Sequence, residues 1–307
     1  MPESFLMLIM ILLYTFNAMF SRLYTDKYPC DKRYAPMVFA VVSGCVVGVV
    51  SFITGLISGG DFVFNPVTFI IGALNAFILY GYDEFLIKSS ASGSYSVLMV
   101  FNLGGAIIIP SVIKAIVPYS AGGTVAITFV QIIAMAIICA SVYMVSKKST
   151  ELEEKNAGAD SGKFFVYCLC LALCNGLHGS LVDIQGELTG TAQKQLLLIY
   201  THIGSAIIAL VRLIIEKKKD FTAPFKQNKP SLIYLLSASL CAALAANMLV
   251  LLVGQVDLSL LYTFSNAGIM LFSSFAAMIL FKEQLSALNI VGCVLMIFGL
   301  VVMGAGG

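Results

Sequence analysis

The chain has 307 residues, of which 59% are hydrophobic and only 11% are charged, and its mean hydropathy is +0.96. Soluble globular proteins carry about 25% charged residues, so this composition excludes a soluble domain and a disordered chain. The formal net charge is only +2, which excludes a nucleic-acid binder that relies on a strongly basic surface. The composition therefore predicts a polytopic, all-α integral membrane protein.

Apolar segments long enough to cross roughly 30 Å of hydrocarbon recur along the whole chain. They are continuously apolar and do not alternate as barrel strands do, so we expect helices. Ten transmembrane helices are predicted, at 3–23, 37–58, 67–87, 94–113, 124–145, 164–183, 195–215, 231–253, 257–281 and 286–304.

Basic residues predict how these helices are oriented, because cytoplasmic loops carry an excess of lysine and arginine. The odd-numbered loops hold 16 of the 18 basic residues, and only Lys114 and Lys194 fall on the other side. We therefore expect the odd-numbered loops in the cytoplasm and both termini outside. The predicted location is the cell membrane, plasma or inner, with the lipid bilayer around a multi-pass chain.

A polar stretch divides the chain into two halves of five predicted helices. Residues 146–163 are rich in Lys, Glu, Gly and Ser and are interpreted as a cytoplasmic linker between a first repeat at 1–145 and a second at 164–307. Two related halves with an odd number of spans must have opposite topologies. Sequence matches support such an inverted repeat, pairing Asn17 with Asn175, Asn102-Leu-Gly with Asn266-Ala-Gly, and Pro66 with Pro230.

The motifs near the end of each half resemble those of a known family. They are Asn266-Ala267-Gly268, then Phe281-Lys282-Glu283-Gln284-Leu285-Ser286 followed by Gly292 and Gly299 in the last apolar span, with an echo in Lys88–Ser92. This pattern resembles the EamA-like transporters of the drug/metabolite transporter (DMT) superfamily. The resemblance implies a central cavity lined by predicted helices one, three, four, six, eight and nine, with helices five and ten at the periphery.

Polar side chains within the spans are the candidates for binding substrate, because in a bilayer each needs a partner or a water-filled cavity. Asparagine both donates and accepts hydrogen bonds without bringing a charge into the membrane. The alternative role for each is a hydrogen bond that holds neighbouring helices together. The predicted substrate-binding residues are Asn17, Asn75, Tyr95, Asn102, Asn175, His178, Tyr262 and Asn266.

The two histidines are candidates for coupling transport to a proton, since histidine titrates near neutral pH. His178 is favoured over His202 because it shares a helix face with Asn175. The alternative is a histidine that only packs between helices.

The acidic side chains and the cysteines receive structural interpretations. Asp83, Glu84 and Glu283 are expected at the membrane interface, paired with lysines or with helix ends, and Asp183 and Asp257 at span ends. Cys168 and Cys170 point about 200° apart on a helix, so they predict no metal site.

The sequence as a whole predicts a secondary transporter of a small polar organic metabolite that works by alternating access. Amino-acid-like, amine and nucleoside-like solutes are all compatible with the predicted cavity. A membrane-embedded enzyme and a non-transporting sensor or assembly subunit are the alternatives. We expect no catalytic site, no metal, no cofactor and no nucleic-acid partner, and either a monomer or a homodimer.

Overall fold

The structure of the protein is a computed structural model that describes residues 3–116, 128–156, 161–189, 193–217, 220–252, 258–283 and 286–305. These residues contain ten α-helices and no strand. The helices are α1 (Glu3–Lys27), α2 (Ala35–Ser58), α3 (Pro66–Ser92), α4 (Tyr95–Ile116), α5 (Phe129–Asn156), α6 (Ser161–Thr189), α7 (Lys194–Lys217), α8 (Lys229–Leu252), α9 (Leu258–Ile279) and α10 (Ala287–Ala305).

The all-α prediction is confirmed, and each of the ten predicted spans coincides with one of these helices. Seven of the helices are long and apolar enough to cross a membrane, and α5, α9 and α10 contain shorter apolar stretches within the described residues. The chain is therefore a multi-pass membrane protein. Many large apolar side chains face outward, such as Ile57, which is 82% exposed, and Phe129, which is 75% exposed. Such a surface is stable when lipid covers it.

Most helices extend beyond the spans predicted from hydropathy. Helix α3 continues to Ser92 and α6 continues to Thr189. Asp83 and Asp183, which were expected near span ends, therefore lie inside continuous helices. The predicted linker at 146–163 is helical at both of its ends, since α5 runs to Asn156 and α6 begins at Ser161. Its residues 157–160 lie outside the described part of the chain.

Local sequence signals mark where α2 ends and α3 begins. Gly59 follows α2 with a φ of 70°, in the left-handed region that glycine tolerates best. The Asn65 side chain then accepts hydrogen bonds from the backbone N–H groups of Val67 and Thr68, and Pro66 occupies the first turn of α3. The chain can thus reverse direction in seven residues, 59–65.

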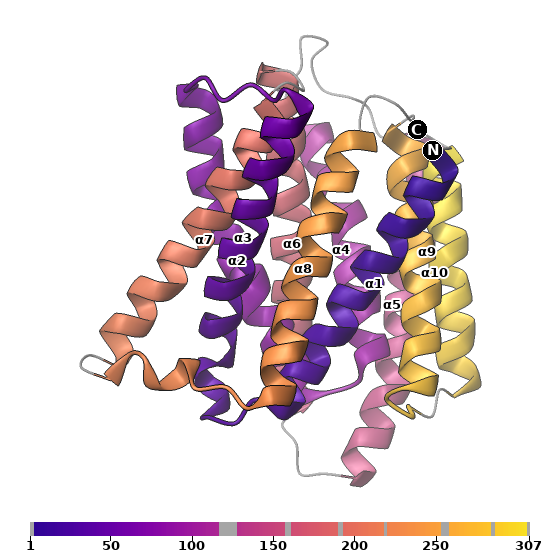
Figure 1. Cartoon of the computed structure of the whole chain (residues 1–307). Helices are drawn as coiled ribbons and strands as arrows, with labels where there is room; N and C mark the ends of the chain where they lie inside the picture. The colour runs from indigo at the N-terminus through magenta and orange to yellow at the C-terminus, as the bar shows by residue number, and fades with distance from the viewer. Residues whose placement is uncertain are drawn as a thin grey trace.

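The helices pack mainly against partners from the other half of the chain. Helix α1 packs against α8 and α9, α2 against α7 and α8, α3 against α6 and α7, α4 against α6, and α5 against α10. In Figure 1, α5, α9 and α10 gather at one side of the bundle and α2, α3 and α7 at the other. In Figure 1 the start of α1 and the end of α10 lie at the same end of the bundle.

Candidate functional site: a central polar cavity

A cavity of about 700 Å³ lies inside the bundle. Its lining residues come from α1, α2, α3, α4, α6, α7, α8 and α9, whereas the described residues of α5 and α10 contribute none. The volume falls within the range of small-molecule sites. The family resemblance implied six of these eight helices and left α5 and α10 at the periphery.

One face of α6 forms a continuous wall of this cavity. Asn175, His178, Val182 and Gly186 line it at the spacings of three and four that keep residues on one side of a helix, and Glu187 lines it at the end of this row. The wall runs from the middle of the bundle to the end where α6 gives way to α7, and Glu187 there is exposed. The cavity therefore extends to this end of the molecule.

Two asparagines meet in the middle of the cavity wall. The Asn175 side-chain amide on α6 donates hydrogen bonds to the Oδ1 of Asn102 (2.7 Å) and to its backbone carbonyl (3.0 Å) on α4. The Asn102 amide in turn donates to the Tyr82 hydroxyl on α3 at 3.4 Å. This chain of hydrogen bonds ties three helices together and leaves polar edges directed at the cavity.

The two histidines both line the cavity. His178 Nδ1 lies 3.0 Å from Asn75 Oδ1, and the Asn75 amide nitrogen donates to the Thr201 hydroxyl at 3.3 Å. Since the Asn75 oxygen can only accept, His178 Nδ1 is the donor, which leaves its Nε2 free to contact a solute. The hydrogen-bond partner of His178 is thus Asn75 on α3, although Asn175 was the neighbour expected from sequence.

The structure brings most of the predicted binding residues to one place. Asn17, Asn102, Asn175, His178, Tyr262 and Asn266 line the cavity together with His202. Asn75 lies one hydrogen bond behind the wall, through His178. Asn17 also donates to the Ala238 carbonyl on α8 at 3.0 Å, so it holds two helices together as well as facing the cavity.

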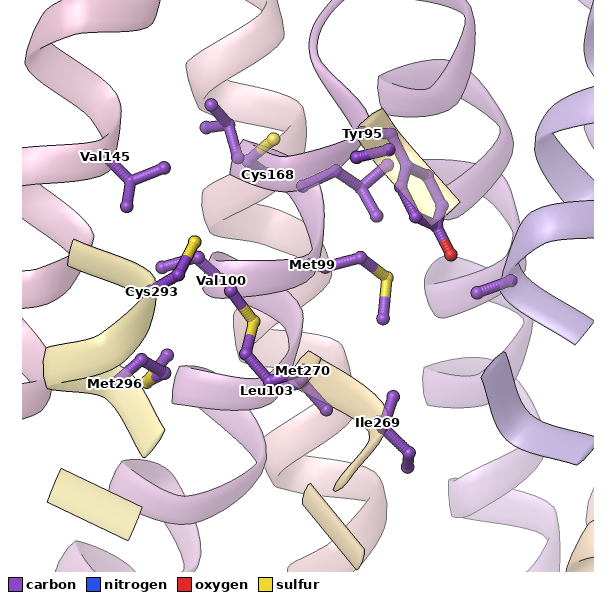
Figure 2. Close-up of a cluster of buried hydrophobic side chains, with 14 of the residues drawn as sticks. Tyr95, Met99, Val100, Leu103, Val145, Cys168, Ile269, Met270, Cys293 and Met296 are labelled. Atoms are coloured by element: carbon purple, nitrogen blue, oxygen red, sulfur yellow. The ribbon is translucent and has the colours of Figure 1, made fainter. Parts of the chain in front are cut away.

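Tyr95 lies elsewhere. Its side chain is fully buried in an apolar cluster with Met99, Met270 and other side chains of α4, α6, α9 and α10 (Figure 2). The two candidates on α4 therefore have different surroundings: Asn102 faces the cavity, whereas Tyr95 contacts Phe281 with ring centroids 5.0 Å apart.

Four charged residues that the sequence analysis did not assign to the binding site also line the cavity: Asp83, Asp183, Glu187 and Lys194. The expectation that Asp83 pairs with a lysine or a helix end is wrong, because its side chain is only 8% exposed, lies inside the bundle and takes part in no ion pair among the described residues. Helix α3 continues two turns past it, so hydropathy misplaced the helix end. The sequence did carry a signal, since Asp83 lies four residues after Leu79 and three before Leu86, both of which face the cavity.

Glu84 and Glu283 have the partners that were predicted for them, a lysine and a helix end. Glu84 pairs with Lys88 and, at 2.5 Å, with Arg212 of α7. Glu283 accepts hydrogen bonds from the backbone N–H of Tyr95 (2.5 Å) and of Ser96 (3.2 Å) at the start of α4. A carboxylate there satisfies N–H groups that have no partner within the helix.

The bundle is tightly packed at its other end, where the basic loops lie. Tyr24 of α1 is fully buried and its hydroxyl donates to the Ala35 carbonyl of α2 at 3.1 Å. Arg22 donates to the Gly93 carbonyl at 2.5 Å and its guanidinium lies 5.6 Å from the centre of the Phe281 ring. These contacts join α1, α2 and the ends of α3 and α9 below the cavity, so the cavity stops before this end.

Within the described ranges, no group of three or more His, Cys, Asp or Glu side chains is arranged to hold a metal ion.

No family model matches the sequence, and no curated protein matches it either. A solved structure described as "Crystal structure of protein" is similar to this chain with a TM-score of 0.62 and 13% identity, over 98% of this chain and 97% of the other. At this identity the likeness concerns the fold alone.

Proposed function

We propose that this chain is a secondary active transporter that moves a small polar organic metabolite across the cell membrane by alternating access, and that it is an EamA-like member of the DMT superfamily. The observation that carries the proposal is the cavity itself. Its lining combines uncharged hydrogen-bonding groups with the charged residues Asp83, Asp183, Glu187 and Lys194, it extends to one end of the bundle, and packed side chains close it at the other. A carrier caught in one of its two states has this form.

The pattern of helix contacts supports an inverted repeat. If each helix of the first half is exchanged with the helix five places later, the α1–α8 contact becomes α6–α3, α2–α8 becomes α7–α3, and α4–α6 becomes α9–α1. The contacts α2–α7 and α5–α10 are returned to themselves. All these pairs occur, as a pseudo-two-fold axis would require. The same exchange relates Asn17 to Asn175 and Asn102 to Asn266, which all line the cavity.

Rocking of one repeat against the other would open the closed end. The contacts that must part are those between the two repeats, namely of Glu283 with the start of α4 and of the Arg22 guanidinium with the Phe281 ring. Each joins different helices or helix ends and can break and re-form without unfolding a helix. Such contacts suit a gate that opens in every cycle.

Proton coupling is assigned to His178. Its ring lines the cavity while Nδ1 is held by Asn75, so the ring is fixed where it can exchange a proton with the cavity. We expect His178→Gln to remove the pH dependence of transport, with His202→Gln as the matched comparison. An unchanged pH dependence in His178→Gln excludes this assignment.

Transport is tested with the purified chain in liposomes. A metabolite panel of amino acids, amines and nucleosides is first screened by thermal stabilisation, and the solutes that bind are then loaded for flux with and without an imposed pH gradient. We expect saturable flux that is absent from protein-free liposomes. Binding without flux of any panel member would contradict a transport function.

A further inference from the structure

Asp83 is a buried carboxylate that faces the cavity without a partner. It is 8% exposed and lines the cavity wall on α3. Among the described residues it takes part in no ion pair and accepts no hydrogen bond. The next residue, Glu84, points away to Lys88 and Arg212. The two adjacent carboxylates therefore have different surroundings. Basic side chains of the protein neutralise Glu84, whereas Asp83 faces the cavity.

An ionised carboxylate in a low-dielectric interior is costly unless a positive charge lies beside it. Because the described chain supplies none to Asp83, the carboxyl is stable in its ionised form only when a compensating charge arrives through the cavity. The described residues place no cluster of further metal-ligating side chains around it, so a metal ion would lack the several oxygen ligands that it needs. An organic cation needs only the one carboxylate and a suitable wall.

Aromatic rings supply that wall. Tyr82 lies close enough to interact electrostatically with both Asp83 and Tyr14. Tyr14 interacts in the same way with Tyr262. All three tyrosines line the cavity. Tyrosine faces attract cations, most strongly where water is excluded, and the remaining lining is largely apolar, with Met99 as one example.

The far end of the cavity has the same sign of charge. Asp183 and Glu187 line it there, and Lys194 is the single lysine or arginine among the described residues that line the cavity. Lys194 is an electrostatic neighbour of Asp183, so Glu187 adds a further negative charge at this end. A path bounded by excess negative charge raises the local concentration of cations.

We propose that the cavity binds an organic cation, an amine or quaternary ammonium compound with an apolar body, and that Asp83 is its counter-ion. This inference rests on the proposed transport function and names the substrate class for the same cavity. Of the three solute classes left open by sequence, it selects the amine.

The test measures binding to the purified full chain by isothermal titration calorimetry at pH 8. The probes are 2-phenylethylammonium and benzyltrimethylammonium, with neutral 2-phenylethanol and anionic 3-phenylpropionate as matched compounds. We expect at least one cation to bind at least about tenfold more tightly than the neutral and anionic probes, which corresponds to about 1.4 kcal/mol.

The variant Asp83→Asn keeps the shape and removes the charge. We expect it to weaken cation binding at least about tenfold and to leave 2-phenylethanol binding unchanged, which also shows that the variant is folded. Asp220→Asn removes an exposed carboxylate outside the cavity and should bind like the wild type. No preference for the cations, or equal cation binding by Asp83→Asn, overturns the inference, and the latter result would also mean that Asp83 is held neutral by a proton.

Flux in liposomes separates this inference from the function on which it rests. Transport of a neutral or anionic solute that is unaffected by Asp83→Asn leaves the transporter proposal standing and contradicts the cation site. Cation binding that depends on Asp83, without flux of any cation, supports the site and contradicts transport.

Discussion

Single side chains decide what the cavity offers to a solute. The four asparagines paired by sequence comparison all reach its wall, because polar groups inside a bilayer bundle are directed away from lipid. Tyr95 is a case in which a polar residue within a span does not line the cavity. Its ring is large enough to be held by packing alone, and nothing in the sequence tells whether a tyrosine lines a cavity or fills a core.

Asn102→Ala should impair binding more than it impairs folding. The change removes the acceptor of the Asn175 amide and the donor to Tyr82, so we expect the substrate Kd or transport KM to rise about tenfold and the unfolding free energy to fall by about 1–2 kcal/mol. Flux assays and thermal unfolding in detergent measure the two effects.

The matched control is Asn247→Ala. Asn247 bonds to Ser51 at 3.1 Å, outside the cavity lining. A similar loss of stability with unchanged affinity is expected. If both variants lower affinity equally, the Asn102 effect is a general consequence of loosened packing.

Glu283→Ala should destabilise the start of α4. Besides the two backbone N–H groups, the hydroxyls of Ser94 and Ser96 donate to Glu283, at 2.9 and 2.6 Å. Leaving several of these donors without an acceptor costs about 1–3 kcal/mol, and the thermal midpoint should fall accordingly. Glu283→Gln retains one acceptor oxygen and should lie between Ala and the wild type; equal midpoints for all three proteins would contradict this role.

At the scale of helices, hydropathy located all ten elements but misjudged their ends. A helix continues past its apolar stretch wherever the polar residues that follow favour helix and find partners, as α3 does through the Glu84–Lys88 ion pair. The sequence predicts the helix crossings only in part, because a glycine in a span indicates that another helix approaches closely but does not identify that helix.

The α4–α6 crossing depends on glycine at 176. A Cβ added there would lie 2.5 Å from the Gly105 carbonyl oxygen and would also overlap Ile109. Gly176→Ala should therefore separate α4 from α6, with a cost of about 1–3 kcal/mol and weaker substrate binding through the Asn102–Asn175 pair.

Gly179→Ala is the comparison one turn further along α6. A Cβ at 179 meets only Pro110 Cγ, at 3.8 Å, so the wild-type midpoint or a small gain from helix propensity is expected. Thermal unfolding of the two variants side by side tests the crossing, and equal midpoints would be inconsistent with it.

The α2–α3 connection should loosen in acid. Hydrogen bonds from the Gln193 side chain and from the Val63 backbone N–H lower the pKa of Asp61 below its ordinary value of 3.8. A lowered folded-state pKa stabilises the fold above the ordinary value, and that contribution is lost as pH falls through the folded pKa.

The thermal midpoint of the wild type should therefore fall more steeply than that of Asp61→Asn between about pH 5 and about pH 3. The difference will be small because the group is exposed. Parallel curves for the two proteins would show that the contact contributes nothing to stability.

For the whole molecule, the number of helices in the described residues follows from sequence, whereas the assembly of the bundle does not. The pairing of α1 with α8 and of α3 with α6 joins helices far apart in the chain. Local hydropathy carries no information about such partners, and the few identities between the halves suggested only that they are related. Cavity-lining residues of α2 and α7, such as Phe39 and Leu197, were missed for this reason.

The orientation is tested by labelling intact cells with a membrane-impermeant maleimide after the eight native cysteines have been replaced. Ser58, the last residue of α2, and Lys226, in the connection between α7 and α8, are both exposed and lie at opposite ends of the bundle. Ser58→Cys should react in intact cells and Lys226→Cys only after permeabilisation. The reverse pattern would mean that the basic loops face outward.

The closed lower end has a pharmacological consequence. Arg22, Tyr24 and Glu283 seal the bundle below the cavity, so a solute in this conformation can approach only along α6 from the opposite end. A bulky blocker with a fixed charge, unable to cross lipid, would act from one face of the membrane and be inert when applied to the other. Such a compound would trap the carrier in this half of its cycle.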